Sequence, residues 1–218
     1  MASSLTYVRF NPHIDMTLIG QLVKCYQEVF AETPWNEWKK CSVCGHKWGI
    51  SHIAELQYLE FRHCGAHVVD FWPEDVVQAD LFHEITPEAS CWLALNGENV
   101  IGFCWGYPIT TEALELKLDF PGLAERIHEF VPARMVAYQD DLGVTKEWRG
   151  CGIARELFRL RLQDYLERGF QLGVIRTKMN PPSVTYTWFK RLGYHEIAHY
   201  ADADQRVILV RSLHDLCI

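Results

Sequence analysis

The sequence predicts an α/β protein of the α+β type, with a central mixed, mostly antiparallel sheet of about seven strands flanked by helices. Three observations support this prediction. Short apolar segments recur along the chain, amphipathic helical segments separate them, and a Cys/His-rich segment interrupts the pattern after the first helix. Because 49% of the 218 residues are hydrophobic, we expect a single domain over residues 1–218 with an insertion over residues 34–72.

The first half of the chain begins with a strand and a helix. Leu5–Phe10 alternates in hydrophobicity and predicts a strand, and apolar residues at helical spacing predict a helix from about Asp15 to Phe30. After the Cys/His-rich segment, Pro73 is suited to begin a second helix. Residues 90–109 then predict two apolar strands around the turn Asn96-Gly97, which is a strong hairpin signal.

The second half alternates between helices and strands. A polar helical segment from Thr111 to Glu129 is interrupted by Pro121. An amphipathic helix from Gly150 to Arg168 lies between two apolar strands, so we expect these strands to be parallel and joined by a right-handed crossover. The other expected elements are the strands Ala133–Val144, Gln171–Met179, Tyr194–Tyr200 and Arg206–Leu213, and a helix over about Pro182–Leu192.

Composition and charge exclude several classes of function. No apolar run approaches the roughly 18 residues of a membrane span, and the first residues, MASSLTYVRF, do not have the regions of a signal peptide. We therefore expect a cytoplasmic protein without a membrane partner. A net charge of -7 and the absence of a Lys/Arg cluster argue against nucleic acid as a partner.

The stretch KEWRGCGIAR, residues 146–155, places two glycines at the expected corner between a strand and a helix. A helix N-terminus exposes about four unpaired backbone N–H groups and a partial positive charge, and glycines let an anion approach them. Arg155 stands where a dinucleotide-binding motif has its third glycine, and no G-K-[S/T] of a P-loop follows. The corner is therefore a candidate phosphate site of another kind.

The segment VTKEWRGCGIARELF, residues 144–158, resembles the acetyl-coenzyme A motif Q/R-x-x-G-x-G/A of the GNAT N-acyltransferases. FKRLGY, residues 189–194, resembles the closing Y-x-x-x-G-F motif of that family. The resemblance extends over the order of elements from Thr6 to about Leu213, apart from the inserted segment. Glu147 departs from the Gln or Arg of the motif, and we expect Arg149 to compensate in part.

This resemblance implies a GNAT-like fold, with acetyl-CoA as cosubstrate and an amine as acceptor. The backbone N–H groups from residue 149 to residue 154 would hold the coenzyme A pyrophosphate, and two strand residues before the corner would bind the pantetheine arm and polarise the thioester. An asparagine after the next strand matches the place of a coenzyme-contacting residue. The implied cofactor-binding residues are Leu142, Val144, Arg149, Gly150, Cys151, Gly152, Ile153, Ala154 and Asn180.

Acyl transfer to an amine requires a base near the attacking nitrogen and an acid near the leaving thiolate. The tyrosine that is the acid in many relatives is replaced by Phe189, and Tyr186, one turn earlier, is the candidate substitute. Asp140 and Asp141 are the candidate bases, and only one of them is expected to face the cleft because consecutive strand residues point to opposite faces. Packing for Tyr186 and strand-end positions for the aspartates are the structural alternatives.

Two kinds of function remain open from the sequence. The first is an enzyme that transfers an acetyl group from acetyl-CoA to a primary amine of a small molecule or peptide. Direct attack is expected, because Cys151 has no neighbouring histidine that would activate it as a nucleophile. The second is a catalytically weak acyl-CoA sensor or a zinc-dependent protein-interaction module. The glycine corner favours the first, whereas Phe189 and Glu147 favour the second.

The insertion contains two pairs of candidate metal ligands. Cys41 and Cys44 form C-x2-C, and Cys64 and His67 form C-x2-H, which is the spacing of a tetrahedral Cys3His zinc site. Four protein ligands leave no open position for substrate, so the sequence predicts structural zinc in preference to a catalytic metal. Zinc would also organise a segment too small to hold a core of its own.

Other interpretations of the insertion remain. His46, His52 and His63 are competing ligands, and the cysteines could be reduced and free of metal. A disulfide is the remaining alternative, although a cytoplasmic protein normally keeps its thiols reduced.

The aromatic residues near the insertion suggest a further role. In the GNAT family the region between the first two helices lines the acceptor side of the cleft. Trp35, Trp38 and Trp48 are candidates for an aromatic wall there, with Glu32 or Glu37 attracting an ammonium group. The alternative is that the tryptophans cover the thin core of the insertion and the carboxylates are solvated.

Overall fold

The computed structural model describes residues 5–179, 183–201 and 205–214. Its main strands are β1 (Leu5–Arg9), β6 (Ser90–Asn96), β7 (Asn99–Thr110), β8 (Met135–Val144), β9 (Leu172–Lys178), β10 (His195–His199) and β11 (Arg206–Ser212). They form one seven-stranded sheet in the order β1-β6-β7-β8-β9-β11-β10. Only β8 and β9 are parallel, so the predicted mixed, mostly antiparallel sheet is confirmed.

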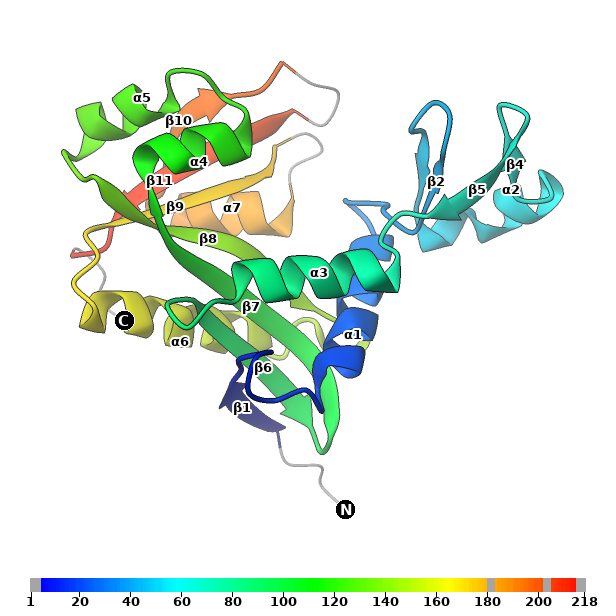
Figure 1. Cartoon of the computed structure of the whole chain (residues 1–218), viewed down its shortest axis with the longest axis horizontal. Helices are drawn as coiled ribbons and strands as arrows, with labels where there is room; N and C mark the ends of the chain where they lie inside the picture. The colour runs from blue at the N-terminus through cyan, green and yellow to red at the C-terminus, as the bar shows by residue number, and fades with distance from the viewer. Residues whose placement is uncertain (1–4, 180–182, 202–204, 215–218) are drawn as a thin grey trace.

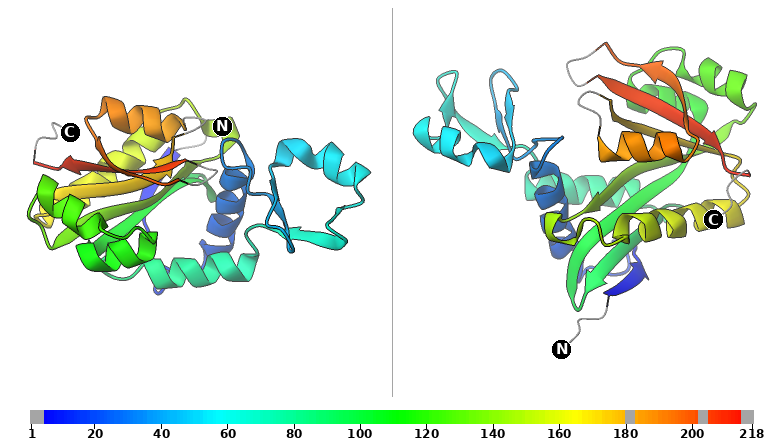
Figure 2. Two further views of the ribbon diagram at one scale, coloured as in Figure 1. Left: turned by 90° about the horizontal axis from the view of Figure 1, so that it is seen from above. Right: turned by 180° about the vertical axis from the view of Figure 1, so that it is seen from behind.

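Helices cover both faces of this sheet. The helices are α1 (Ile19–Ala31), α3 (Glu74–Glu84), α4 (Thr111–Leu118), α5 (Leu123–Phe130), α6 (Ile153–Glu167) and α7 (Val184–Arg191). The helices α1, α3, α4 and α5 lie on one side, and α6 and α7 lie on the other (Figures 1 and 2). None of the helices within the described residues is both long enough and apolar enough to cross a membrane.

Period-two alternation in β6 and β7 explains why both faces are covered. Leu93 and Phe103 belong to the buried cluster formed with α1 and α3. Ala94 and Cys104, the next residues along the two strands, belong instead to the cluster formed with α6. Because successive strand residues point to opposite faces, apolar residues at every position need a helix on each side.

Two local predictions differ from the structure by a few residues. The first helix begins at Ile19 instead of Asp15, because the Asp15 carboxylate accepts hydrogen bonds from the backbone N (2.9 Å) and Oγ1 (2.6 Å) of Thr17 and forms a turn. The hairpin turn lies one residue later than predicted. Asn96 pairs with Asn99, which leaves residues 97–98 as the loop.

The parallel strands β8 and β9 stay together for only a short distance. Their pairing is confined to Ala137 with Gly173 and Tyr138 with Val174, and α6 forms the crossover between them. The predicted parallel pair is thus correct. Beyond Tyr138 the two strands separate, so the seven-stranded sheet is open on the β9 side of residues 139–144 (Figure 1).

The Cys/His-rich segment forms a second, smaller sheet that projects beside α1 (Figures 1 and 2). It has four strands in the order β3-β2-β5-β4, with a short helical region between β3 and β4. Its elements are β2 (Lys39–Cys41), β3 (Lys47–Trp48), a 3₁₀ turn (Ile50–His52), α2 (Ile53–Tyr58), β4 (Arg62–His63) and β5 (Ala66–Asp70). The sequence analysis did not predict these strands, because strands of two or three residues are too short to show a periodicity.

Candidate functional site

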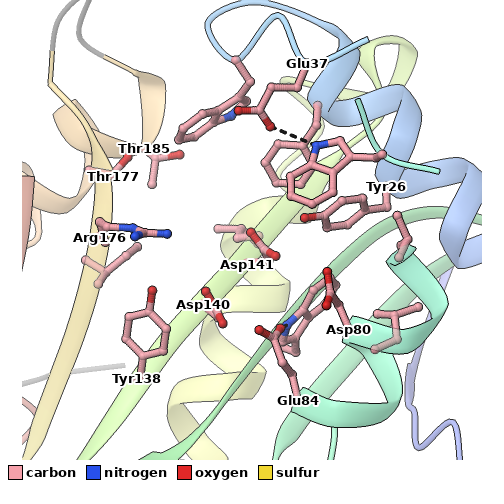
Figure 3. Close-up of a pocket in the computed structure, with 18 of the residues that line it drawn as sticks. Tyr26, Glu37, Asp80, Glu84, Tyr138, Asp140, Asp141, Arg176, Thr177 and Thr185 are labelled. Carbon is pink, nitrogen blue, oxygen red and sulfur yellow. Dashed lines mark hydrogen bonds between the residues drawn. The ribbon is translucent and has the colours of Figure 1, made fainter. Parts of the chain in front are cut away.

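A cavity of about 260 Å³ lies between α1, α3 and the separating parts of β8 and β9 (Figure 3). Aromatic side chains from α1, from β7 and from the two junctions with the insertion form much of its wall. The charged residues that line it are Glu37, Asp80, Glu84, Asp140 and Asp141, together with Lys117, Arg176 and Arg206. Carboxylates therefore outnumber cations, and such a cavity favours a positively charged ligand.

Asp140 and Asp141 both face this cavity (Figure 3), so the prediction that only one of them does is wrong. The reason is a β-bulge. Asp141 pairs with Trp105 and Tyr138 pairs with Tyr107, so two residues of β8, Gln139 and Asp140, oppose a single residue of β7. The extra residue interrupts the strict alternation of side chains, which brings two consecutive carboxylates to one face.

Gly106, the residue of β7 opposite the bulge, allows the two strands to come this close. A Cβ at this position would contact the backbone oxygen of Tyr138 and the hydroxyl of Tyr165, and would lie 3.0 Å from Cα of Gln139. Only a residue without a side chain fits there.

A buried hydrogen-bond network holds the bulge from the α6 side. Nη1 of Arg161 donates to the backbone oxygens of Trp105 and Asp141, each at 2.8 Å, and its Nη2 donates to Oε1 of Gln139 at 3.1 Å. Nε2 of Gln139 donates to the hydroxyl of Tyr194 at 2.7 Å. Arg161 and Gln139 are fully buried, and buried polar groups are costly unless they are hydrogen-bonded, so this network favours one arrangement of the bulge.

The two aspartates differ in their surroundings. Asp140 is held by the Tyr107 hydroxyl at 2.8 Å and by Nζ of Lys117 at 3.3 Å. Within the described residues, no hydrogen bond or ion pair holds the Asp141 carboxylate. Burial, reinforced by the negative charges of Asp140 and Glu84, raises the pKa of Asp141 well above its usual value. Asp141 is thus the carboxylate better placed to accept a proton.

Glu84 and Lys117 belong to the same site, although the sequence analysis did not single them out. Oε1 of Glu84 lies 2.7 Å from Nζ of Lys117, and its Oε2 accepts a hydrogen bond from Nε1 of Trp105 at 3.0 Å. Burial and the Asp140 charge raise the pKa of Glu84 to about 7, against the opposing effect of Lys117. These residues come from different helices and carry no local motif, so no sequence pattern could have identified them.

The two glycines of the corner before α6 adopt the left-handed conformation. Gly150 and Gly152 both have φ of +82°, and no heavy atom lies within 4 Å of a Cβ built on either. Gly152 is the residue that precedes the first turn of α6. The open space beside two left-handed residues leaves the backbone N–H groups at this end of α6 accessible to an anion.

The last part of β8 presents backbone groups toward the open side of the sheet. The backbone N of Thr145 donates to the oxygen of Ile101 at 3.0 Å, which makes this a hydrogen-bonded pair. Hydrogen-bonded and non-hydrogen-bonded pairs alternate in an antiparallel ladder, so the N–H and C=O groups of Leu142 and Val144 point away from β7. The oxygen of Val144 accepts a hydrogen bond from Nε of Arg149 at 3.1 Å.

The structure does not bring the other candidate residues into the cavity. The Tyr186 hydroxyl donates to Oε1 of Glu196 at 2.9 Å, and Tyr186 does not line the cavity. Phe189 is fully buried, and its ring packs edge-on against Tyr194. Cys151 is exposed at the glycine corner, and Asn180 lies outside the described residues.

In the insertion, Cys41, Cys44, His63 and Cys64 form a cluster whose ligand atoms all lie within 4.8 Å of one another. Nδ1 of His63 lies 3.5 Å from Sγ of Cys44 and 3.2 Å from Sγ of Cys64. A tetrahedral zinc ion with ordinary bond lengths separates a sulfur and a nitrogen ligand by about 3.6 Å. The donor set and its spacing therefore fit zinc.

The fourth ligand differs from the one predicted. The sequence pattern favoured His67, but the structure places His63, one of the competing histidines, beside the three cysteines. Nε2 of His67 instead lies 3.3 Å from Nη2 of Arg62. His63 and Cys64 lie where β4 turns into β5, and this turn brings adjacent residues to the cluster.

The predicted aromatic wall is only partly present. Trp35 and Glu37 line the cavity. Trp48 is buried in the small core of the insertion, and its Nε1 donates to Oε1 of Glu55 at 3.0 Å. Glu32 forms an ion pair with Lys146 at 3.2 Å and does not line the cavity.

Comparisons with known proteins agree on the fold. PaiA N-acetyltransferase from Thermoplasma acidophilum, in complex with coenzyme A, is 10% identical with a TM-score of 0.57, over 96% of this chain and 99% of that chain. Polyamine N-acetyltransferase from Drosophila melanogaster is 14% identical with a TM-score of 0.60, over 96% and 100%. Arabidopsis thaliana NAA60 in complex with acetyl-CoA is 12% identical with a TM-score of 0.56, over 97% and 99%.

Sequence comparison gives the family. No curated protein sequence matches the chain. The model of the acetyltransferase (GNAT) family matches residues 50–194, which is more than half of the 218 residues. The matched region includes the bulge in β8, the glycine corner and α6. The chain therefore belongs to the GNAT family of acetyltransferases.

Proposed function

We propose that the protein transfers an acetyl group from acetyl-CoA to a primary amine of a small molecule or peptide by direct attack. The observation that carries this proposal is the Asp141 carboxylate, which faces an acidic and aromatic cavity without a hydrogen-bonding partner among the described residues. It lies next to Leu142, on the open edge of β8.

The cosubstrate would bind along this open edge. The pyrophosphate of acetyl-CoA would lie against the backbone N–H groups from Gly150 to Ala154, beside the open space at Gly150 and Gly152. The N–H of Arg149, also expected to take part, donates instead to the oxygen of Lys146 at 3.3 Å. The pantetheine arm would pair with the outward backbone groups of Leu142 and Val144. This arrangement would bring the thioester to the bulge, and a backbone N–H there would stabilise the developing oxyanion.

Asp141 is proposed as the general base. A primary amine must lose a proton before or during attack, and a carboxylate with a raised pKa accepts it more readily than an ordinary aspartate. The new C–N bond forms as the carbonyl becomes tetrahedral, and the C–S bond breaks when this intermediate collapses. The proton taken from the nitrogen leaves with the coenzyme A thiolate as its thiol.

The chemistry of the cavity supports an amine acceptor. Five carboxylates attract an ammonium group, and aromatic rings from Tyr26, Trp72 and Trp105 provide faces on which a cation is stable. The relatives named above include an enzyme that acts on polyamines, which agrees with an amine as the acceptor of this chain.

We also propose a structural zinc ion at Cys41, Cys44, His63 and Cys64. The fully buried residues of the insertion's core are Cys41, Trp48 and Leu56, and so small a core contributes little stability. Backbone N–H groups of Val43 and Cys44 lie 3.4 and 3.5 Å from Sγ of Cys41, and such contacts stabilise a thiolate. Metal analysis of the purified protein should give one zinc per chain, and Cys41→Ser should remove it.

Release of coenzyme A from acetyl-CoA, measured with pooled amines, tests the transferase function. Asp141→Asn should lower kcat by about 10²- to 10⁴-fold while calorimetry shows unchanged acetyl-CoA binding. Asp75→Asn, an exposed aspartate at the start of α3, is the matched control and should retain full turnover. If Asp141→Asn turned over as fast as the parent protein, Asp141 would not be the general base. Binding of acetyl-CoA without turnover of any amine would indicate the acyl-CoA sensor instead.

A further inference from the structure

We propose that the metal cluster of the insertion governs acceptor binding, because it holds Glu37 and Trp72 in the wall of the active-site cavity, where they contact the amine. The inference rests on the proposed transferase function and adds a role for the insertion. Its starting observation is that Glu37, which precedes β2, and Trp72, which follows β5, both line the cavity. Figure 3 shows the Glu37 side chain there.

Glu37 and Trp72 are bonded to each other across the base of the insertion. Oε2 of Glu37 accepts a hydrogen bond from Nε1 of Trp72 at 3.0 Å. One residue farther into the insertion, the backbone N of Phe71 donates to the oxygen of Trp38 at 3.1 Å. The pair therefore continues the ladder of the inserted sheet into the active site.

The same ladder leads to the metal ligands. Lys39 pairs with Asp70, and their side chains form an ion pair of 2.6 Å. Two positions on, the metal ligand Cys41 pairs with Val68. At the rise of an extended strand, the four steps from Glu37 to Cys41 span about 13 Å, so the cluster lies at the other end of the strands that carry the cavity wall.

A second connection runs from the loop of the first cysteine pair. This loop ends at β3, where Nζ of Lys47 lies 3.4 Å from Oε1 of Glu37. The backbone N of Cys41 donates to the oxygen of His46 at 2.8 Å and closes the loop. Loss of the metal would loosen this loop and with it the position of Lys47 beside Glu37.

The main body also contacts the base of the insertion. The backbone N of Glu37 donates to the oxygen of Phe30 at 2.8 Å, and Nε2 of Gln27 donates to the oxygen of Trp72 at 2.8 Å. The Trp72 ring packs edge-on against Tyr26, with centroids 5.5 Å apart. The Glu37 carboxylate contacts Trp72 and Lys47, and Lys47 belongs to the inserted sheet.

The position of Glu37 and Trp72 explains why loss of the metal would weaken binding of the amine but not binding of acetyl-CoA. Glu37 and Trp72 line both the active-site cavity and a neighbouring cavity of about 660 Å³ between α1 and the insertion. The negative charge of Glu37 is one of those that raise the pKa of Asp141, so Glu37 lies close enough to influence the proposed base. The proposed acetyl-CoA site, formed by the glycine corner and the open edge of β8, contains no residue of the inserted sheet.

The test compares Cys44→Ser, which removes an exposed ligand, with Glu37→Gln, which leaves the cluster intact. The control is Tyr58→Ser, a change at an exposed residue of α2 in the same insertion that alters no ligand. For each variant we would measure zinc content, acetyl-CoA affinity by calorimetry, amine affinity by calorimetry, and the KM for the best amine.

We expect Cys44→Ser to lose zinc, to bind acetyl-CoA as before and to raise the amine Kd and KM about tenfold, which corresponds to about 1.4 kcal/mol. Glu37→Gln should retain zinc and give a similar rise, and the double variant should show no further rise, because the two changes act on one wall. Tyr58→Ser should match the parent protein.

The inference would be overturned by a parent protein without bound metal, by unchanged amine affinity in zinc-free Cys44→Ser, or by additive effects in the double variant. Failure of the transferase proposal would be seen separately as amine binding without coenzyme A release. In that case the inference is still tested by whether the amine binds more weakly to zinc-free Cys44→Ser than to the parent protein. Weaker acetyl-CoA binding in Cys44→Ser would also contradict it, because the effect would then extend to the whole fold.

Discussion

Arg161 joins the two sides of the active-site bulge through one nitrogen, since its Nη1 lies 2.8 Å from the backbone oxygen of Asp141 and 2.8 Å from that of Trp105. The guanidinium comes from the buried face of α6 and never reaches the cavity. It acts as a positioning residue, because it holds the backbone from which the proposed base projects.

Replacing Arg161 with Met should therefore affect both stability and catalysis. Hydrogen bonds from a charged group contribute about 1.5 to 3 kcal/mol each, so denaturant unfolding should show a loss of about 3 kcal/mol or more. The acid limb of the kcat/KM pH profile should also move, because Asp141 no longer occupies a fixed position. Arg159→Met, on the exposed face of α6, should change stability by less than about 0.5 kcal/mol. If the pH profile of Arg161→Met were the same as that of the parent protein, Arg161 would have only a structural role.

Gly106→Ala should prevent the bulge from forming. Its Cβ would collide with the backbone of Tyr138, which cannot move without breaking the pairing of β7 and β8. We expect a loss of at least about 3 kcal/mol in thermal or denaturant unfolding, at the upper end of overpacking effects. Gly20→Ala in α1, where no heavy atom lies within 4 Å, should be neutral or stabilising. A stable Gly106→Ala protein with unchanged activity would contradict the described geometry.

Gly150→Ala separates backbone strain from ligand binding. A left-handed conformation costs an alanine about 1 to 2 kcal/mol, and a shift of the backbone away from it would weaken acetyl-CoA binding, which calorimetry measures. Gly169→Ala is the matched control, because Gly169 also has a left-handed φ of +76° and open surroundings but lies beyond the other end of α6. Both variants should lose similar stability. Equal acetyl-CoA affinities in the two would remove the corner from the binding site.

The pH dependence of activity should depend on Asp141. Burial and the neighbouring carboxylates raise the pKa of Asp141, so the base is protonated at pH values where an ordinary aspartate is charged. We expect kcat/KM to fall as the pH drops through this raised pKa, and the fall should occur at a higher pH than for a solvated aspartate. Arg176→Met removes the cation that lowers this pKa and should move the limb to still higher pH. A limb that stays in place in Arg176→Met would contradict this electrostatic account.

The stability of the protein should fall as the pH rises through the titration of Glu84. Burial raises the pKa of Glu84 to about 7 in the folded protein, above the ordinary glutamate value of 4.5, so between these values the folded state binds more protons than the unfolded state. The unfolding free energy should decrease over this interval by up to about 3 kcal/mol. Glu84→Gln should flatten the dependence, measured by denaturant unfolding at several pH values. The exposed Glu88→Gln should leave it as it is in the parent protein.

Local patterns in the sequence predicted most elements of the fold. Alternating and continuous apolar segments predicted each strand of the main sheet, and the segment from Gly150 to Arg168 predicted the crossover helix between the parallel strands. The two-to-three-residue strands of the insertion escaped prediction, because pairing across β2 and β5 defines them and no periodicity within either strand does.

The sequence by itself determined the family, through the glycine corner and the order of elements, and it determined that cysteine pairs would gather in the insertion. Tertiary structure decided which side chains meet. In the folded protein both Asp140 and Asp141 face one cavity, and His63 instead of His67 lies beside the three cysteines. The Tyr186 hydroxyl is hydrogen-bonded to Glu196. The physical reason is that a local pattern encodes backbone conformation and the buried face, whereas strand register, a bulge and long-range packing set the distances between groups far apart in the chain.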